Sequence, residues 1–220
     1  MAVARLNLAR VEGGAALVQD EQGVVRLQGG RPLGLEDGLI GRTPLEAVYL
    51  TQQISADSGV THGLAAVLAA EDAGQLPVAH NGLLLRDLMH TLSLLHAHLR
   101  HFYFRVLPDY LPPGAWETYG GALSEIKAIA RGFGRKGANS WGRFKRSHPF
   151  AKKQVVRLIE HQVRAVAALS RLQRMIAAVG GKFPMVMSLV PGGASVPVDE
   201  GLVLKLRDHL REIDGFLGEG

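Results

Sequence analysis

The first thirty residues alternate between apolar and polar side chains. In a strand Leu6 and Leu8 would face one side, whereas Arg5 and Asn7 would face the other. This period of two is typical of a strand with one face turned to a core. The stretch is divided by "EGG" and by a second turn from Asp20 to Gly23. Residues 1–30 are therefore predicted to form three short antiparallel strands.

From Thr43 the period changes to that of a helix. "TPLEAVYLTQQIS" places Thr43 at the N-cap, Pro44 at the first helical position and Glu46 at the third, which is a helix start. A second helix is expected from Ser58, and a third after Pro77. The third carries apolar residues at three- and four-residue steps, and these are expected to form its buried face: Leu85, Leu88, Leu92, Leu95, Leu99, Phe102 and Val106. Helices are thus predicted over 43–107.

The remaining third of the chain contains a glycine-rich basic loop and two helices. "GFGRKGANSWGRFKRSHP" (132–149) lacks any helical or strand period. Helices are predicted over 150–217, the last of them starting at Asp199. The long helix before it has this predicted core face: Val156, Ile159, Val163, Val166, Leu169, Leu172, Ile176 and Val179. The expected fold is α+β, a single domain over 1–220, mostly helical with a small N-terminal antiparallel sheet.

Composition places the chain among globular proteins and removes several chemistries. Hydrophobic residues make up 47% and charged residues 20% of the 220, which is ordinary for a soluble domain. The sequence contains no cysteine, so disulfides, thiolate metal sites and cysteine nucleophiles are excluded for these residues. No signal peptide and no membrane-spanning stretch is recognisable, so cytoplasmic residence is expected.

The net charge of +5 comes from one segment. No Asp or Glu occurs between Ile126 and Ile159, and the loop within this stretch is strongly basic. Aromatic residues lie between the charges, as they do in single-strand nucleic-acid sites. Docking of an acidic protein surface explains the block more simply, and we expect it in preference to nucleic-acid binding. The expected docking residues are Arg135, Lys136, Arg143, Lys145 and Arg146.

The histidines of the third predicted helix suggest a metal site only weakly. His98 and His101 share a helix face and are of a ligand type. No carboxylate occurs at a matching spacing on that face, so a structural role is favoured and no metal site is predicted there.

Six segments, taken in order, resemble one known family. They are "RVEGGAAL", "LGLEDGLIGRTPLEAVYLTQQIS", "SGVTHGLAAVLAAEDAGQLPV", "NGLLLRDLMHTLSLLHAHLRHFYFRVLPDYL", "GANSWG" and "GGKFPMVMSLVPGG". Together they resemble the N-terminal part of the large subunit of nickel–iron hydrogenases. The resemblance is collinear over most of the chain, and it implies a hydrogenase-large-subunit-like fold.

The sequence departs from that family at the positions that the resemblance assigns to the metal centre. In the family a CxxC pair supplies two thiolates to the nickel–iron site; the matching positions here are Ser55 and Ser58. A serine hydroxyl stays protonated near neutral pH and is a poor ligand for soft metal ions. The arginine that precedes the first family cysteine is Gln53. A second cysteine pair, near the family's C-terminus, has no counterpart here.

Other positions of the family's site are retained. His62 matches the histidine that follows the family's CxxC, and Glu12 matches a glutamate implicated in proton transfer. Glu36 matches a carboxylate that binds a structural magnesium in many members, and it is the weak magnesium candidate of this chain. With every thiolate ligand missing, we expect no resident cofactor and no enzymatic activity.

The resemblance then implies an accessory role. The expected function is a non-catalytic large-subunit-like protein that acts in assembly or maturation of a nickel–iron hydrogenase, as a scaffold or chaperone-like factor. Its expected partners are hydrogenase subunits or maturation factors. Two alternatives remain: a structural subunit or half of a larger redox complex, and a cofactor-free quinone-site subunit resembling that of respiratory complex I.

Overall fold

The computed structural model of the 220-residue chain describes residues 2–8, 15–29, 34–55, 58–111, 115 and 150–219. Contacts between Cα atoms divide the chain into two compact units, Met1–Thr43 and Pro44–Gly220. Each unit is described by itself below. The prediction of a single domain over 1–220 stays a prediction. The basic loop, 132–149, lies outside the described residues.

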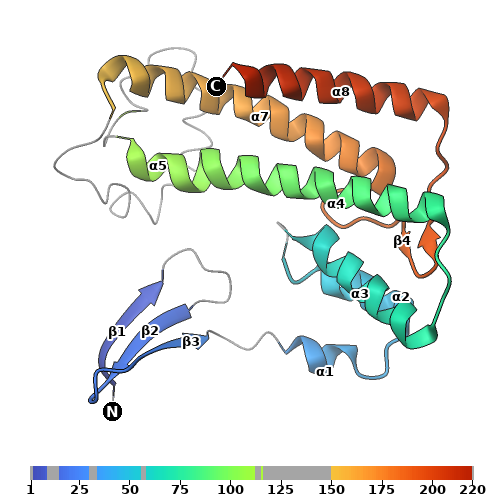
Figure 1. Ribbon diagram of the computed structural model, residues 1–220, viewed down its shortest axis with the longest axis horizontal. Helices are drawn as coiled ribbons and strands as arrows, with labels where there is room; N and C mark the ends of the chain where they lie inside the picture. Colours follow the sequence, from blue (N-terminus) through green and yellow to red (C-terminus); the bar gives the residue numbers. More distant parts are fainter. Residues whose placement is uncertain are drawn as a thin grey trace. The chain divides into compact units, whose positions relative to one another are not determined.

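The N-terminal unit contains the predicted antiparallel sheet (Figure 1). Its strands are β1 (Ala2–Leu8), β2 (Ala15–Asp20) and β3 (Val25–Gly29), paired in the order β1-β2-β3. Helix α1 (Leu35–Leu39) follows in the same unit.

The turn between β2 and β3 is fixed by one carboxylate. Asp20 Oδ1 accepts hydrogen bonds from the backbone N–H groups of Gln22 at 3.0 Å and Val24 at 2.9 Å. Gly23 has a φ of 81°, a left-handed conformation that glycine adopts without steric cost. The turn predicted from Asp20 to Gly23 is confirmed.

The C-terminal unit is mostly helical. Its elements are α2 (Pro44–Gln52), α3 (Gly59–Gly74), α4 (His80–Arg100), the π-helix η1 (His101–Val106), α5 (Leu107–Tyr110), α7 (Lys152–Gly180), β4 (Leu189–Val190), β5 (Gly193–Ala194) and α8 (Glu200–Gly218). The terminal helix begins as predicted, because Asp199 Oδ1 accepts the N–H of Leu202 at 2.7 Å.

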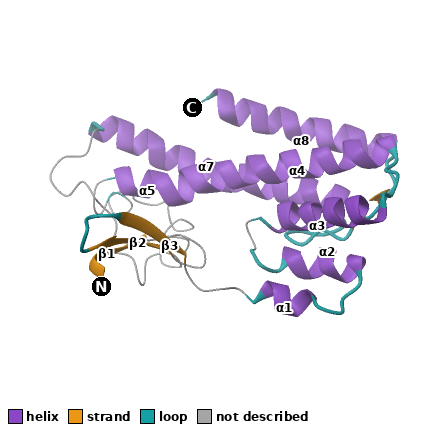
Figure 2. Ribbon diagram, turned by 60° about the horizontal axis from the view of Figure 1, so that its bottom comes forward, coloured by secondary structure: helices purple, strands orange, loops and turns teal. Residues whose placement is uncertain are grey.

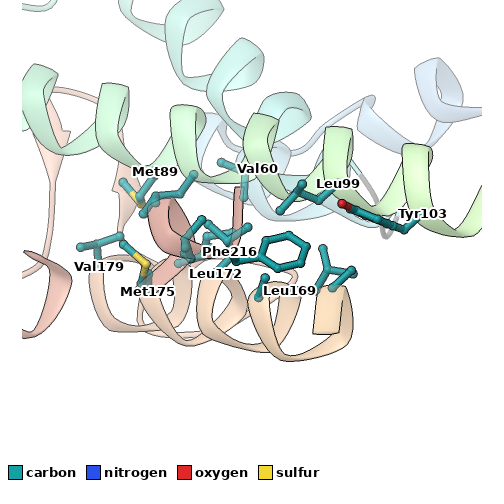
Figure 3. Packing of buried hydrophobic residues seen from close by; sticks show 14 of the residues in the cluster. Val60, Met89, Leu99, Tyr103, Leu169, Leu172, Met175, Val179 and Phe216 are labelled. Atoms are coloured by element: carbon teal, nitrogen blue, oxygen red, sulfur yellow. The ribbon is translucent and has the colours of Figure 1, made fainter. Parts of the chain in front are cut away.

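The core of this unit lies along α7. Figures 1 and 2 show α4, α7 and α8 lying lengthwise along one another. Figure 3 shows how their apolar side chains meet: Met89 and Leu99 come from α4, Leu172 and Met175 from α7, and Phe216 from α8. Helix α7 has helical neighbours on two sides, so it buries a broad arc rather than a narrow stripe.

The buried face of α4 is rotated from the predicted stripe. Leu92 and Leu99 are buried as expected, but Phe102 is 48% exposed and Tyr103 is buried in its place. The buried residues Met89, His96 and Tyr103 recur at seven-residue steps, so this rotation is already present within α4 before η1 begins. Gln162 Nε2 donates a hydrogen bond to the Tyr103 carbonyl at 2.7 Å and so ties η1 to α7.

The predicted face of α7 is correct only in part. Five of its eight predicted residues are buried, whereas Val166 is 36% exposed and Val156 and Val163 are half-buried. Small residues take part of the interface instead, with Ala165 and Ala168 buried. Alanines let neighbouring helices approach closely. A prediction of the buried face that counts only large apolar residues misses these positions.

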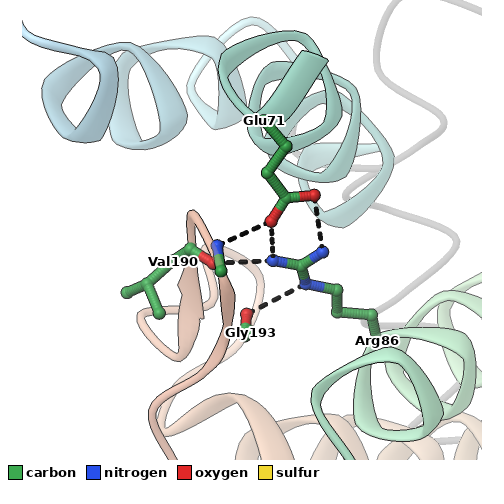
Figure 4. Close-up of polar contacts among 5 residues, drawn as sticks. Glu71, Arg86, Val190 and Gly193 are labelled. Carbon is green, nitrogen blue, oxygen red and sulfur yellow. Dashed lines mark hydrogen bonds and ion pairs between the residues drawn. The ribbon is translucent and has the colours of Figure 1, made fainter. Parts of the chain in front are cut away.

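A buried ion pair connects α3, α4 and the β4–β5 hairpin (Figure 4). Arg86 donates through Nη1 to Glu71 Oε2 at 3.0 Å and through Nη2 to Oε1 at 2.5 Å. It also donates to the carbonyls of Gly193 at 2.9 Å and Val190 at 2.7 Å. Glu71 Oε1 accepts the N–H of Gly192 at 2.7 Å. The hairpin is therefore bonded to both charges.

The electrostatics of Glu71 agree with this geometry. The hydrogen bond from Arg86 lowers the pKa of the Glu71 carboxyl, burial opposes that effect, and the Gly192 N–H lowers the pKa further. The carboxylate is therefore held in its charged form, as a hydrogen-bonded buried pair requires.

Glycine permits the close approach of the hairpin to α4. A Cβ added at Gly82 would lie 2.7 Å from the Cα of Gly193, which is closer than real Cβ contacts. The hairpin can therefore reach Arg86 only because residue 82 has no side chain.

Among the described residues, none of the helices is both long enough and apolar enough to cross a membrane.

Replacing Arg86 with Met should lower the free energy of unfolding by about 3–5 kcal/mol, because Glu71 would be left buried without its partner. The double variant Glu71→Leu/Arg86→Met should recover much of that loss. Urea denaturation followed by circular dichroism measures both values. The control is Arg171→Met, which breaks a partly exposed ion pair with Glu212 and should cost no more than about 1 kcal/mol. Equal losses for the Arg86 and Arg171 variants would contradict the structural role of the buried pair.

Candidate functional site

The candidate site lies where α2 ends and α3 begins. Ser55 follows the end of α2 and is buried, with 4% of its surface exposed. Ser58 is the N-cap residue of α3 and is half-buried; its side chain makes no capping hydrogen bond. His62, one turn into α3, donates its backbone N–H to the Ser58 carbonyl at 3.0 Å and is half-buried. Ser58 and His62 therefore share the first turn of α3, and Ser55 lies just beyond the end of α2, while residues 56 and 57 lie outside the described residues. The end of α2, Ser55 and the first turn of α3 are together called the frame below.

Gln52 connects the parts of this frame, although no pattern in the sequence pointed to it. Its side chain is fully buried, and Nε2 donates to the carbonyls of Val48 at 3.2 Å and Val186 at 3.0 Å. One amide thus links α2 to the segment that precedes β4. Its Oε1 is buried and makes no hydrogen bond to any of the residues that the structure describes.

Two glycines let α3 pack directly onto Gln52. A Cβ at Gly63 would lie 2.8 Å from Gln52 Cγ, and a Cβ at Gly59 would lie 3.1 Å from the Gln52 carbonyl oxygen. Thr51 Oγ1 donates to the Val48 carbonyl at 3.3 Å and also lies 3.4 Å from the His62 carbonyl. The close packing of α2 on α3 fixes the backbone on both sides of Ser55 and Ser58.

The remaining predicted site residues are Gln53, Glu36, Glu12 and the five basic docking residues. Gln53 is exposed, and its backbone N–H donates to the Leu50 carbonyl at 3.0 Å. Glu36 is exposed in the first turn of α1, which belongs to the N-terminal unit. Glu12 and the five basic docking residues Arg135, Lys136, Arg143, Lys145 and Arg146 lie outside the described residues.

The donor atoms of this frame do not suit a nickel–iron centre. The two positions that would present thiolates present serine hydroxyls, which are neutral and hard donors. Within the part of the chain that the structure describes, no three His, Cys, Asp or Glu residues are grouped to hold a metal ion. The frame therefore presents hydroxyls at the two positions that correspond to the family's thiolates.

A second polar cluster joins η1, α7 and α8. Tyr103 Oη and His161 Nδ1 are 2.6 Å apart, and the Phe216 ring stacks on His161 with 4.5 Å between ring centroids. His161 Nε2 is buried and makes no hydrogen bond in the described structure. Arg164 forms an ion pair with Glu219 and lies over the Phe216 ring, 6.0 Å from its centroid. The C-terminal end of α8 is thus anchored beside a buried histidine.

Both buried histidines are held neutral. Burial is the main cause that lowers the pKa of His161, and the nearby charges of Arg164 and Arg157 add to it while Glu219 opposes it. Burial alone lowers the pKa of His96, whose Nε2 lies 3.2 Å from Gln173 Nε2. His96 is buried in α4, and the Phe183 ring contacts it edge-on with 5.1 Å between ring centroids. His98 and His101, for which a structural role was favoured, are exposed.

The comparisons with known proteins agree with the fold and the frame. Residues 33–118 match the family described as Nickel-dependent hydrogenase. The Periplasmic NiFeSe hydrogenase large subunit of Desulfomicrobium baculatum is 27% identical over 220 aligned residues, which cover 96% of this chain and 40% of that protein. The Hydrogenase-2 large chain of Escherichia coli K12 is 28% identical over 214 residues, covering 84% of this chain and 37% of that one.

This chain resembles the N-terminal part of a nickel-dependent hydrogenase large subunit. The solved structure of the Ni-Fe-Se hydrogenase from D. vulgaris Hildenborough in its as-isolated oxidized state has the same fold, with a TM-score of 0.74 and 24% identity over 98% of this chain and 42% of that chain. The chain therefore spans about two fifths of the length of these relatives. The large-subunit resemblance and the mostly helical fold with a small antiparallel sheet are confirmed.

Lowering the pH should destabilise the fold through His96 and His161. Each has a folded-state pKa below the ordinary value of about 6.5, so the unfolded chain binds more protons in that range. Their contribution to stability is complete above pH 6.5 and declines as the pH falls below it. Urea midpoints measured between pH 8 and pH 5 report this slope.

The control for this prediction is His161→Gln, which keeps a polar group beside Tyr103 but does not titrate. The decline of the midpoint below pH 6.5 should be shallower in this variant than in the wild type. An identical slope in both proteins would contradict the assignment to His161.

Proposed function

We propose that the chain is a non-catalytic large-subunit-like protein that acts in the assembly or maturation of a nickel–iron hydrogenase, as a scaffold or chaperone-like factor. The observation that carries the proposal is serine at both positions of the frame, Ser55 and Ser58. If a separate polypeptide supplied the rest of the metal site, the completed site would still lack these two thiolates. Hydroxyls at such positions do not replace them for soft, low-valent metal ions.

The structure around the two serines supports a role that depends on shape. Gln52, Gly59 and Gly63 keep α2 packed on α3, although the donor atoms of a metal centre are missing. The ion pair of Glu71 and Arg86 keeps the neighbouring hairpin in place. A protein that retains this surface without the chemistry is suited to bind what a large subunit binds. On this proposal the partners are hydrogenase subunits or maturation factors, and the site of action is the cytoplasm.

The second candidate function is half of a larger redox complex, paired with a separate polypeptide. The similarity of the chain to the N-terminal part of large subunits, such as the D. baculatum protein, is the observation that favours it. The two candidates differ in the protein that should be recovered with the chain: a maturation factor or hydrogenase subunit for the first, and a chain resembling the remainder of a large subunit for the second.

Purified protein is expected to contain far less than about one nickel or iron per chain and to show no hydrogen oxidation. Elemental analysis after purification from the native host under anaerobic conditions measures the metal content. About one nickel per chain would overturn the non-catalytic proposal.

Engineered thiols give a matched test of the same frame. Ser55→Cys/Ser58→Cys should raise the affinity for added Ni²⁺ well above that of the wild type, because two thiolates replace two hydroxyls. Ser55→Ala/Ser58→Ala should leave the weak binding unchanged. Isothermal titration with Ni²⁺ compares the three proteins. Wild-type affinity equal to that of the double cysteine variant would show that the hydroxyls suffice as ligands.

Affinity purification from the native host should recover hydrogenase subunits or maturation factors. Reversing the charge at Arg143, Lys145 and Arg146 should weaken that recovery, because the basic loop is proposed to dock an acidic surface. The matched control reverses three exposed basic residues outside the loop, Arg174, Lys182 and Lys205, and should leave recovery intact. Recovery of neither kind of protein, identified by mass spectrometry, would contradict the assembly role.

A further inference from the structure

Helix α8 carries an apolar row that the described part of its own unit leaves partly exposed. Its buried face, Leu206, Ile213 and Phe216, packs toward the core. Beside that face lie Val203, Leu210 and Leu217, which are 43%, 40% and 43% exposed. Seven-residue steps keep such positions nearly in line along a helix, with a drift of about 20° per step. The three side chains therefore form one row, here called the α8 row, about 21 Å long at 1.5 Å per residue.

Opposite charges lie along one edge of the α8 row. Arg207 and Asp214 are both exposed, and each comes four residues after a member of the row, so both lie on the same side of it. In the described part of the chain, neither side chain forms an ion pair. The edge therefore offers one positive and one negative group, seven residues apart.

This arrangement is complementary to itself when two helices run antiparallel. A twofold axis at Leu210 sets Leu210 against Leu210 of the second copy, and Val203 against Leu217 of the second copy. Arg207 then lies one residue, about 1.5 Å along the axis, from the level of Asp214 of the second copy. The symmetry repeats that pair, so two ion pairs flank three apolar contacts. A parallel arrangement would place the two charged edges on opposite sides of the interface and leave them unpaired.

We infer that α8 is a self-association surface through which two copies of this chain pair antiparallel about Leu210. The row is short and each member is already more than half covered, so the interface is small. A concentration-dependent dimer is expected rather than an obligate one. This inference is independent of the proposed role in hydrogenase assembly.

The apolar part of the surface is tested by sedimentation velocity of the full chain over a range of concentrations. The wild type should shift from monomer to dimer as its concentration rises. Leu210→Glu should remain monomeric, because it sets two carboxylates against each other on the axis. The matched control is Leu204→Glu, a residue 50% exposed and about a third of a turn around the helix from Leu210, which should dimerise like the wild type. Unchanged circular dichroism establishes that the variants are folded.

Variants of the charged edge give a second test, because their expected effects do not depend on losing apolar contacts. Arg207→Asp and Asp214→Arg should each raise the dissociation constant about tenfold, because each sets like charges together twice. The exchanged variant Arg207→Asp/Asp214→Arg should restore dimerisation. A wild type that stays monomeric at every concentration, a Leu210→Glu variant that dimerises, or an exchange without rescue would each overturn the inference. If the wild type stays monomeric, the α8 row would instead be a candidate binding surface for a helix of another protein.

Discussion

The helical unit depends on a charge pair that water does not reach. Glu71 and Arg86 are almost fully buried, and removing two ions from water is costly unless their hydrogen-bonding groups are satisfied. The structure meets that requirement with the β4–β5 hairpin, whose Val190 and Gly193 carbonyls and Gly192 N–H complete the network. The hairpin has only two residues in each strand, so these bonds, together with the glycine contact at residue 82, set its position.

The position of the hairpin in turn affects the candidate site. The segment that leads into β4 carries Val186, whose carbonyl accepts from Gln52, and Pro184, whose carbonyl lies close to Gly59. The buried pair and the serine frame therefore belong to one packed arrangement of α2, α3, α4 and the hairpin. This continuity gives a physical reason why the frame can persist when its metal ligands are replaced. Its backbone is held by amide, carbonyl and glycine contacts, and none of these uses a metal.

Loss of the ligands and retention of the shape have different chemical consequences. Thiolates at the two positions would supply negative charge and soft sulfur donors, whereas Ser55 and Ser58 supply neutral hydroxyls. Ser55 is buried within the frame, and Ser58 begins α3. A fold similar to that of a hydrogenase large subunit can thus form without thiolates at these two positions, and the proposed assembly role starts from this combination.

The sequence by itself determined the local structure and the family frame. The alternation of apolar and polar residues predicted the three strands, and Pro44 and Asp199 marked two helix starts. The segment from Thr51 to His62 resembles the family's metal-site segment, with serine at both cysteine positions. These features depend on neighbours in the chain, so local patterns report them.

Only the tertiary structure decided which charged and polar residues are buried. Arg86 and Gln52 look exposed by residue type, yet they are buried by partners distant in sequence. Arg86 binds Glu71 on α3 and the β4–β5 hairpin, and Gln52 binds the Val186 carbonyl as well as Val48 on its own helix. The helices that pack on α4 decided which arc of it is buried, so Met89, His96 and Tyr103 face the core and Phe102 is left exposed. Burial of this kind is a property of contacts between distant segments, and the period of a single helix does not contain it.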